Sequence, residues 1–201
     1  MKKILIIFIL IFSILSTTAF ADATIKNILG GGDTITDPFH LPEGSLIFSM
    51  QSSGEGNFIA WLLDENREKI ELLANEIGLF SGSRGIGIPK TGDYSLAVKA
   101  SNLWSVKILK PNKAENEKFS LISGSGAKGT HLYHIDSGLK SFKTEYLGEG
   151  NFIVWLLNEK GRKIAILANE IGTFSGVKET NIPSSGFYLF DIQAEGKWEI
   201  S

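Results

Sequence analysis

Apolar and polar residues alternate along most of the chain after residue 22. In the segment 93–100, "DYSLAVKA", Tyr94, Leu96 and Val98 fall on one side, and the segment 187–194 repeats the pattern. A period of two residues is typical of β-strands with one buried face. The chain is therefore predicted to consist mainly of short strands.

Short clusters of turn-forming residues separate these predicted strands. They are "PEG", "GEGN", "DENRE", "GSRG" and "PKTGD", followed later by "NEKGR" and "PSSGF". Turns spaced roughly every 8–12 residues across about seven strands are typical of a β-sandwich. In "NEKGR", Gly161 is predicted to take the left-handed position of a hairpin, and Asn66 is predicted to do so in the earlier, related turn.

The chain contains the same domain twice. The 29 residues 54–82 recur as 148–176, and the offset of 94 positions extends without a gap over 28–107 and 122–201, where about 34 of 80 positions are identical. This predicts an all-β fold, a tandem duplication of an approximately 80-residue antiparallel β-sandwich of the jelly-roll or Ig-like type. The predicted domains span 22–109 and 118–201, joined by a polar linker at 110–117.

The closing strands of each copy carry a resemblance to known modules. The first copy ends with G-x-Y-x-L-x-V-x-A at 92–100, followed by W-x-V-x-I at 104–108, and the second copy ends similarly. This ending resembles bacterial and archaeal secreted β-sandwich modules of the pre-peptidase C-terminal or Ig-like type. The resemblance implies a non-catalytic accessory module and assigns no functional residue.

The N-terminus has the pattern of a signal peptide. Lys2 and Lys3 precede an apolar run from Ile4 to Leu15, and "STTAFADA" supplies small residues for cleavage near Ala21. The run is shorter than the roughly 20 apolar residues of a membrane-spanning helix. The segment 1–21 is therefore predicted to be removed, which leaves a secreted, periplasmic or extracellular chain with no transmembrane segment.

Composition excludes several classes of function. The chain has no cysteine, so disulfides, thiol catalysis and cysteine-ligated metals are excluded. With 20 basic and 22 acidic residues, the formal net charge of −2 argues against a nucleic-acid partner. No metal or cofactor is predicted.

The sequence favours no enzymatic activity. Its three histidines are His40, His131 and His134, and no G-x-S-x-G elbow accompanies them. His131 and His134 would point to opposite faces of a strand, so they would not share a metal. No catalytic residue is predicted.

Two polar pairs recur inside the duplicated segment: Asn75 with Glu76, and Asn169 with Glu170. The favoured interpretation is structural, with each pair shaping the turn before the following glycine. The alternative is a calcium site, which would need six or more oxygen ligands. The number of nearby acids is low for such a site.

The strand "NFIAWLLD" at 57–64 is apolar on both faces, and so is its counterpart at 151–158. Loop cover or packing between domains would explain the second apolar face. The functional alternative is an aromatic binding platform. Its ligand-binding residues would be Trp61, Trp155, Asn57 and Asn151.

Three function classes follow from these patterns. The leading one is an exported, non-catalytic binding or adhesion protein that recognises an envelope polymer, glycan or protein partner. The alternative is a structural cell-envelope scaffold whose apolar faces pack against further copies. A secreted hydrolase is the third.

Overall fold

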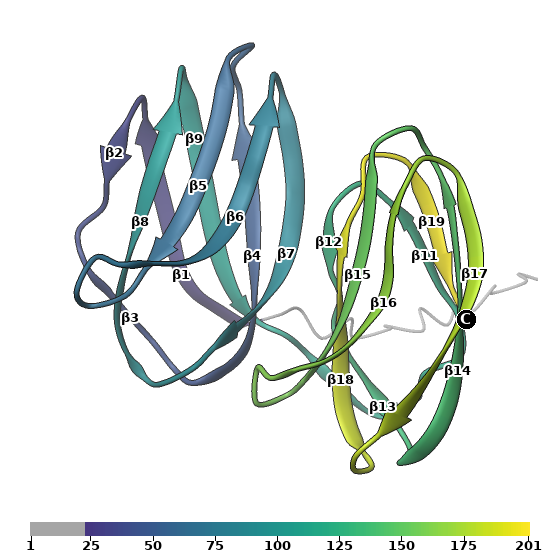
Figure 1. The fold of residues 1–201 in the computed structure, drawn as a ribbon. Coiled ribbons are helices and arrows are strands. Elements are labelled where there is room, and N and C mark those ends of the chain that lie inside the picture. Colours follow the sequence, from purple (N-terminus) through teal and green to yellow (C-terminus); the bar gives the residue numbers. More distant parts are fainter. Residues whose placement is uncertain (1–22) are drawn as a thin grey trace, which may run out of the picture.

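The computed structural model describes residues 23–201, which form two β-sandwiches side by side (Figure 1). The predicted all-β tandem architecture is confirmed, because each sandwich consists of two facing sheets. The predicted signal peptide lies outside the described residues. Residues 23–201 contain no helix that could cross a membrane.

In the first sandwich, one sheet has the strand order β1-β9-β4-β7 and the other the order β2-β8-β5-β6, with β3 also pairing with β8. The strands are β1 (Ala23–Gly31), β2 (Thr34–Ile35), β3 (Phe39–Leu41), β4 (Gly44–Ser52), β5 (Asn57–Leu63), β6 (Lys69–Ile77), β7 (Phe80–Ile88), β8 (Gly92–Ala100) and β9 (Leu103–Lys110).

The second sandwich repeats this plan, with one sheet in the order β11-β19-β14-β17 and the other in the order β10-β13-β18-β15-β16, to which β12 adds beside β18. The strands are β10 (Lys113–Lys118), β11 (Ile122–Ser125), β12 (Lys128–Gly129), β13 (Leu132–Ile135), β14 (Gly138–Leu147), β15 (Asn151–Asn158), β16 (Lys163–Ile171), β17 (Phe174–Ile182), β18 (Gly186–Gln193) and β19 (Lys197–Ile200).

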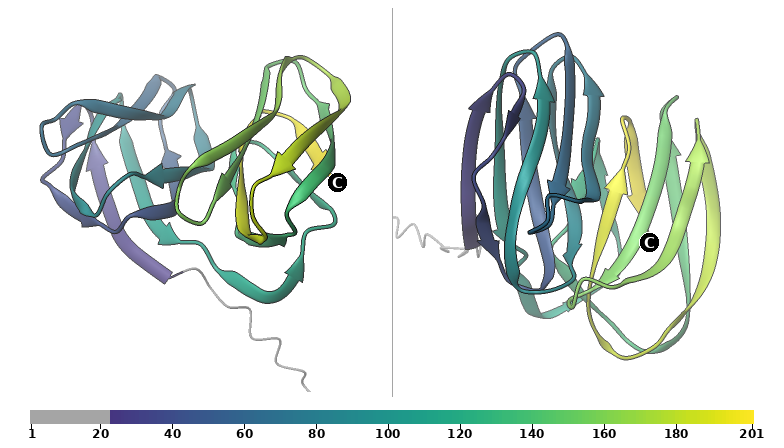
Figure 2. Two further views of the ribbon diagram at one scale, coloured as in Figure 1. Left: turned by 60° about the horizontal axis from the view of Figure 1, so that its bottom comes forward. Right: turned by 60° about the vertical axis from the view of Figure 1, so that its left-hand side comes forward.

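The connection between the sandwiches contains a strand. Within the predicted linker, β10 begins at Lys113, and it runs parallel to β13, with Lys113 opposite Leu132. This segment is the teal stretch that passes from the first sandwich to the second (Figure 2). The pairing ties the connection to the second sandwich.

Each sandwich has its own apolar core, built from the inward positions of the alternating strands. The two cores use matching polar anchors. The indole Nε1 of Trp104 donates to the carbonyl of Gly32 at 3.1 Å, and that of Trp198 donates to Gly126 at 2.9 Å. A Cβ at Gly30 would lie 2.2 Å from the Trp104 ring, so this recurring glycine leaves room for the indole.

The β5–β6 and β15–β16 hairpins show one correct prediction and one wrong one. Gly161 has a positive φ of 80°, as predicted. In the first domain Arg67, and not Asn66, takes that conformation, with φ 63°. The reason is that the Asp64 carboxylate accepts the Asn66 and Glu68 amides at 2.9 Å, which fixes the loop shape around residue 67.

Candidate functional site

The two candidate tryptophans occupy equivalent positions on β5 and β15, and both are half-buried. A lysine ammonium lies over each ring: Lys69 at 4.8 Å from the centroid of Trp61, and Lys163 at 5.2 Å from that of Trp155. The two tryptophans differ in their other surroundings.

Trp155 belongs to the contact between the domains. It packs with Phe187 against a small buried cluster of Leu132, Leu157 and Leu189. Leu189 in turn approaches the first domain so closely that a Cβ at Gly85 would lie 2.3 Å from its Cδ1. In the second domain, the apolar outer face of the strand is therefore covered by domain packing.

Trp61 lies in an open groove of about 460 Å³ on the first domain. The groove runs over β2, β5 and β8. It is lined by Asp33, Thr34, Ile35, Ile59, Trp61, Lys69, Ala97, Val98 and Lys99. The same face is thus occupied in one domain and open in the other.

The two candidate asparagines do not join these tryptophans. Asn57 and Asn151 are exposed at the first residue of β5 and β15. Each is four residues from its tryptophan, which is about 13 Å along an extended strand. Asn57 does not line the Trp61 groove.

The repeated pair Asn75 and Glu76 lies within β6, and Asn169 with Glu170 lies within β16. Consecutive residues of a strand point to opposite faces, so neither pair can converge on one cation. The following glycines have positive φ, as the turn interpretation requires. Among the described residues, no group of three or more histidines and acids is placed to hold a metal.

Glu76 and Glu170 have different surroundings despite their equivalent positions. Glu76 is half-buried, whereas Glu170 is exposed. Burial raises the pKa of Glu76 above its ordinary value of 4.5, and the negative charge of Glu195 in the second domain raises it further. The folded state therefore favours the protonated carboxyl, and the ionised form costs stability.

We expect Glu76→Gln to unfold at a higher temperature than the native chain at pH 7. The gain should shrink as the pH falls through the raised folded-state pKa of Glu76 and should be lost below 4.5, because Glu76 is then neutral in both the folded and unfolded states. Thermal unfolding followed at several pH values measures it. Glu170→Gln is the matched control and should change little, and an equal gain in both variants would contradict the role of the domain contact.

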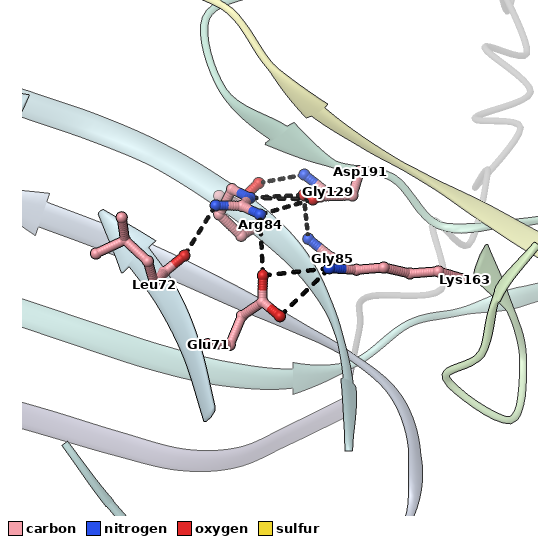
Figure 3. A network of polar contacts seen from close by, with 8 residues as sticks. Glu71, Leu72, Arg84, Gly85, Gly129, Lys163 and Asp191 are labelled. Carbon is pink, nitrogen blue, oxygen red and sulfur yellow. Dashed lines mark hydrogen bonds and ion pairs between the residues drawn. The ribbon is translucent and has the colours of Figure 1, made fainter. Parts of the chain in front are cut away.

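The domain contact is centred on a buried ion pair (Figure 3). Arg84 of β7 donates from Nε and a terminal nitrogen to the Asp191 carboxylate of β18, both at 2.8 Å. The Gly85 amide donates to the same carboxylate at 2.9 Å. Arg84 is 6% exposed and Asp191 is fully buried.

Two further groups complete this network. The other terminal nitrogen of Arg84 donates to the Leu72 carbonyl at 3.1 Å, and Glu71 lies 3.7 Å from the guanidinium and 3.3 Å from Lys163. Burial acts to lower the pKa of Arg84, but the charges and hydrogen bonds of Asp191, with Glu71, outweigh it and raise the pKa. The guanidinium therefore stays charged inside the contact.

Glycines let the two domains approach at backbone distance. A Cβ at Gly87 would lie 1.8 Å from the Gly161 carbonyl oxygen, and one at Gly129 would lie 2.5 Å from the Gly85 nitrogen. Ser45 also donates from its amide to the Glu159 carbonyl at 3.0 Å. Side chains at these glycine positions would push the domains apart.

Sequence patterns alone do not pick out this contact. The one signal is Asp191, a charged residue in the apolar run "YLFDIQ", whose counterpart in the first copy is Ala97. Buried carboxylates are paired in folded proteins, which would have indicated a partner but not which one.

The three histidines contact different partners. His40 Nδ1 lies 3.0 Å from the exposed Asp93 carboxylate, and His134 lies edge-on to Phe187. The His131 ring packs against Tyr133 with centroids 4.4 Å apart.

Comparisons with known proteins assign the chain to no family. No family model and no curated protein matches the chain. Solved structures that match include a chain with the M60 catalytic domain and the CBM51-1 and CBM51-2 domains of Clostridium perfringens ZmpB. That match has a TM-score of 0.30 and 9% identity, and covers 87% of this chain and 34% of that one.

Two further solved structures match at similar levels. The PBSX exported protein XepA has a TM-score of 0.29 and 8% identity over 90% of this chain and 85% of its own. A fucolectin from striped bass (Morone saxatilis) serum has a TM-score of 0.23 and 9% identity over 87% and 84%. TM-scores this low carry no argument, so the β-sandwich fold rests on the sheets described above, and kinship with the pre-peptidase C-terminal or Ig-like type stays a prediction.

Proposed function

We propose that the protein is an exported, non-catalytic binding protein that holds its ligand on the open Trp61 groove of the first domain. The proposal rests on one difference between the two domains: the same outer face of the sandwich is covered in the second domain and open in the first. In the second domain this face receives the first domain through Leu189 and Asp191. In the first domain the equivalent face remains an open groove around Trp61.

The groove combines an indole with the hydroxyl of Thr34 and two ammonium groups, from Lys69 and Lys99, which outnumber the single carboxylate of Asp33. The face of a sugar ring packs against an indole, and an acidic substituent pairs with an ammonium. The cation–π contact of Lys69 is worth about 0.5–1 kcal/mol at an exposed site, so this side chain is free to swing toward an anionic group. An acidic polysaccharide fits these features.

The alternative of a scaffold built from further copies finds less support. The three glycines that allow close approach have bulkier counterparts at the free ends of the pair: Glu179 for Gly85, Asn181 for Gly87 and Ile35 for Gly129. Ala97 stands where Asp191 would be needed. A second molecule therefore could not dock at either end of the pair by repeating the contact between the domains.

We expect the chain from Asp22 to Ser201 to bind immobilised polygalacturonate and alginate more tightly than neutral dextran or cellulose. Trp61→Ala should weaken the binding about tenfold or more, because truncating a central aromatic contact costs more than about 1.4 kcal/mol. Binding isotherms at constant salt measure both results. Thermal unfolding confirms that the variant is folded.

Trp155→Ala is the matched control. We expect it to lower the stability of the domain contact while leaving polymer binding in place. Equal binding by the native chain and Trp61→Ala would overturn the assignment of this groove. If the native chain bound neither polygalacturonate nor alginate, the proposal of an acidic polysaccharide as the ligand would be overturned.

A further inference from the structure

A second pair of grooves lies on the outer faces of the sheets β1-β9-β4-β7 and β11-β19-β14-β17. Their volumes are about 560 Å³ and 810 Å³. Every lining residue of the first groove has its counterpart, 94 positions later, in the lining of the second. Neither groove overlaps the Trp61 groove.

In the second domain, a continuous polar row crosses all four strands of the sheet. Ser123 lies opposite Glu199, Glu199 opposite Glu145, and Glu145 opposite Ser175. Lys197 lines the same groove, and so do the hydroxyls of Ser125 and Thr173. Neighbouring positions on these strands, such as Trp198, point into the core, so the row faces outward.

The two grooves share two aromatic lining residues and differ in their polar residues. Phe80 and Trp104 of the first correspond to Phe174 and Trp198 of the second. The polar row of the second replaces a row that is uncharged in the first. That row consists of Leu29, Ser105, Gln51 and Ser81.

The carboxylate of Glu145 is held in place by hydrogen bonds and stays ionised as an acceptor. Glu145 Oε1 accepts from Lys143 Nζ at 2.9 Å and from Ser175 Oγ at 3.2 Å, and these bonds lower the pKa of Glu145. Glu199 lies directly opposite on the next strand. Like charges at such cross-strand positions repel, and donors placed between them relieve the repulsion.

We propose that this groove of the second domain binds one sugar residue whose hydroxyl groups, or an ammonium in an amino sugar, donate to Glu145 and Glu199, while its apolar lining takes the face of the ring. Hydroxyls that donate to a carboxylate form stronger bonds than those between neutral partners. Lys197 and the hydroxyls of Ser123 and Ser125 serve the acceptor oxygens of the sugar. The volume suits a single ring, with room for its neighbours in a chain.

The inference goes beyond the proposed function, because two lysines and one carboxylate line the Trp61 groove, whereas two carboxylates and one lysine line this groove. A chain with both sites would join an acidic polymer to a neutral or amino-substituted glycan. Two different sites on one chain bind such a composite surface more tightly than either alone.

The test is a titration of the ¹⁵N-labelled chain 22–201 with glucose, glucosamine and, as a plain cation, ammonium chloride. We expect saturable shifts of the Glu145, Ser175 and Glu199 amides with at least one sugar. Stronger binding of glucosamine would identify an amino sugar, and equal binding would identify the hydroxyls as the donors. Glu145→Gln and Glu199→Gln should each weaken sugar binding about tenfold.

Gln51→Ala, at the counterpart of Glu145 in the first domain, is the matched control and should bind as the native chain does. Trying the same sugars on Trp61→Ala separates the two sites, because this variant should keep its sugar binding. Three results would overturn the inference: no shift with either sugar, the same shifts with ammonium chloride, or unchanged binding in both glutamine variants.

Discussion

Asp191→Ala is expected to lower the free energy of unfolding by about 3 kcal/mol or more, because it leaves the buried Arg84 guanidinium without its main partner. The Gly85 amide loses its acceptor in the same step. Urea unfolding followed by tryptophan fluorescence measures the loss, and small-angle scattering shows whether the domains separate.

Two further variants make this result specific. Lys163→Ala removes a partly exposed ion pair with Glu71 from the same network and should cost less than about 1 kcal/mol. Arg84→Met combined with Asp191→Leu removes both charges and should recover much of the stability. Asp191→Ala unfolding at the native urea concentration would contradict the buried ion pair as the centre of the contact.

Gly87→Val is expected to open the domain contact around the β15–β16 hairpin. Its Cβ would overlap the Gly161 carbonyl oxygen, and overpacking of this kind costs about 1–3 kcal/mol. The hydrogen bond from the Ser45 amide to Glu159 should break as the hairpin moves away. Hydrogen exchange of the Ser45 amide measures this directly as a loss of protection.

Gly92→Val is the matched control, because Gly92 begins β8 and a Cβ there would meet no atom within 4 Å. Valine suits a strand, so this variant should keep the native protection. Equal loss of protection in both variants would show that the effect is local to the β-strand glycine and not to the contact.

The duplication and the alternating pattern predicted most of the fold. Residues such as Tyr94 and Leu96 face the core because a period of two places them there, and Gly161 takes its left-handed conformation because the hairpin requires one. These are local rules, which act within a few residues. The prediction for the first hairpin was wrong, because the Asp64 carboxylate fixes a loop in which Arg67 has the left-handed conformation.

The site could be predicted only in part. The doubly apolar strand indicated that something covers Trp61 or Trp155, but the pattern is the same in both copies. The difference arises from residues on another domain, since Arg84 and Asp191 meet across 107 positions of the chain. Outward rows such as Glu145 with Glu199 likewise depend on strand register, which the alternation of single strands does not give.

The contact of the second domain with β7 affects the risk of aggregation while the chain folds. β7 is an edge strand, and its outward amides are taken up by the second domain, with Ser83 donating to the Ala127 carbonyl at 3.0 Å. The corresponding edge strand, β17, carries Lys178 and Glu179 where β7 has Arg84 and Gly85, and charges of this kind keep edges from pairing. A first domain that has folded before its neighbour therefore exposes this edge with only Arg84 as a charge, and docking of the second domain removes the exposed edge from aggregation.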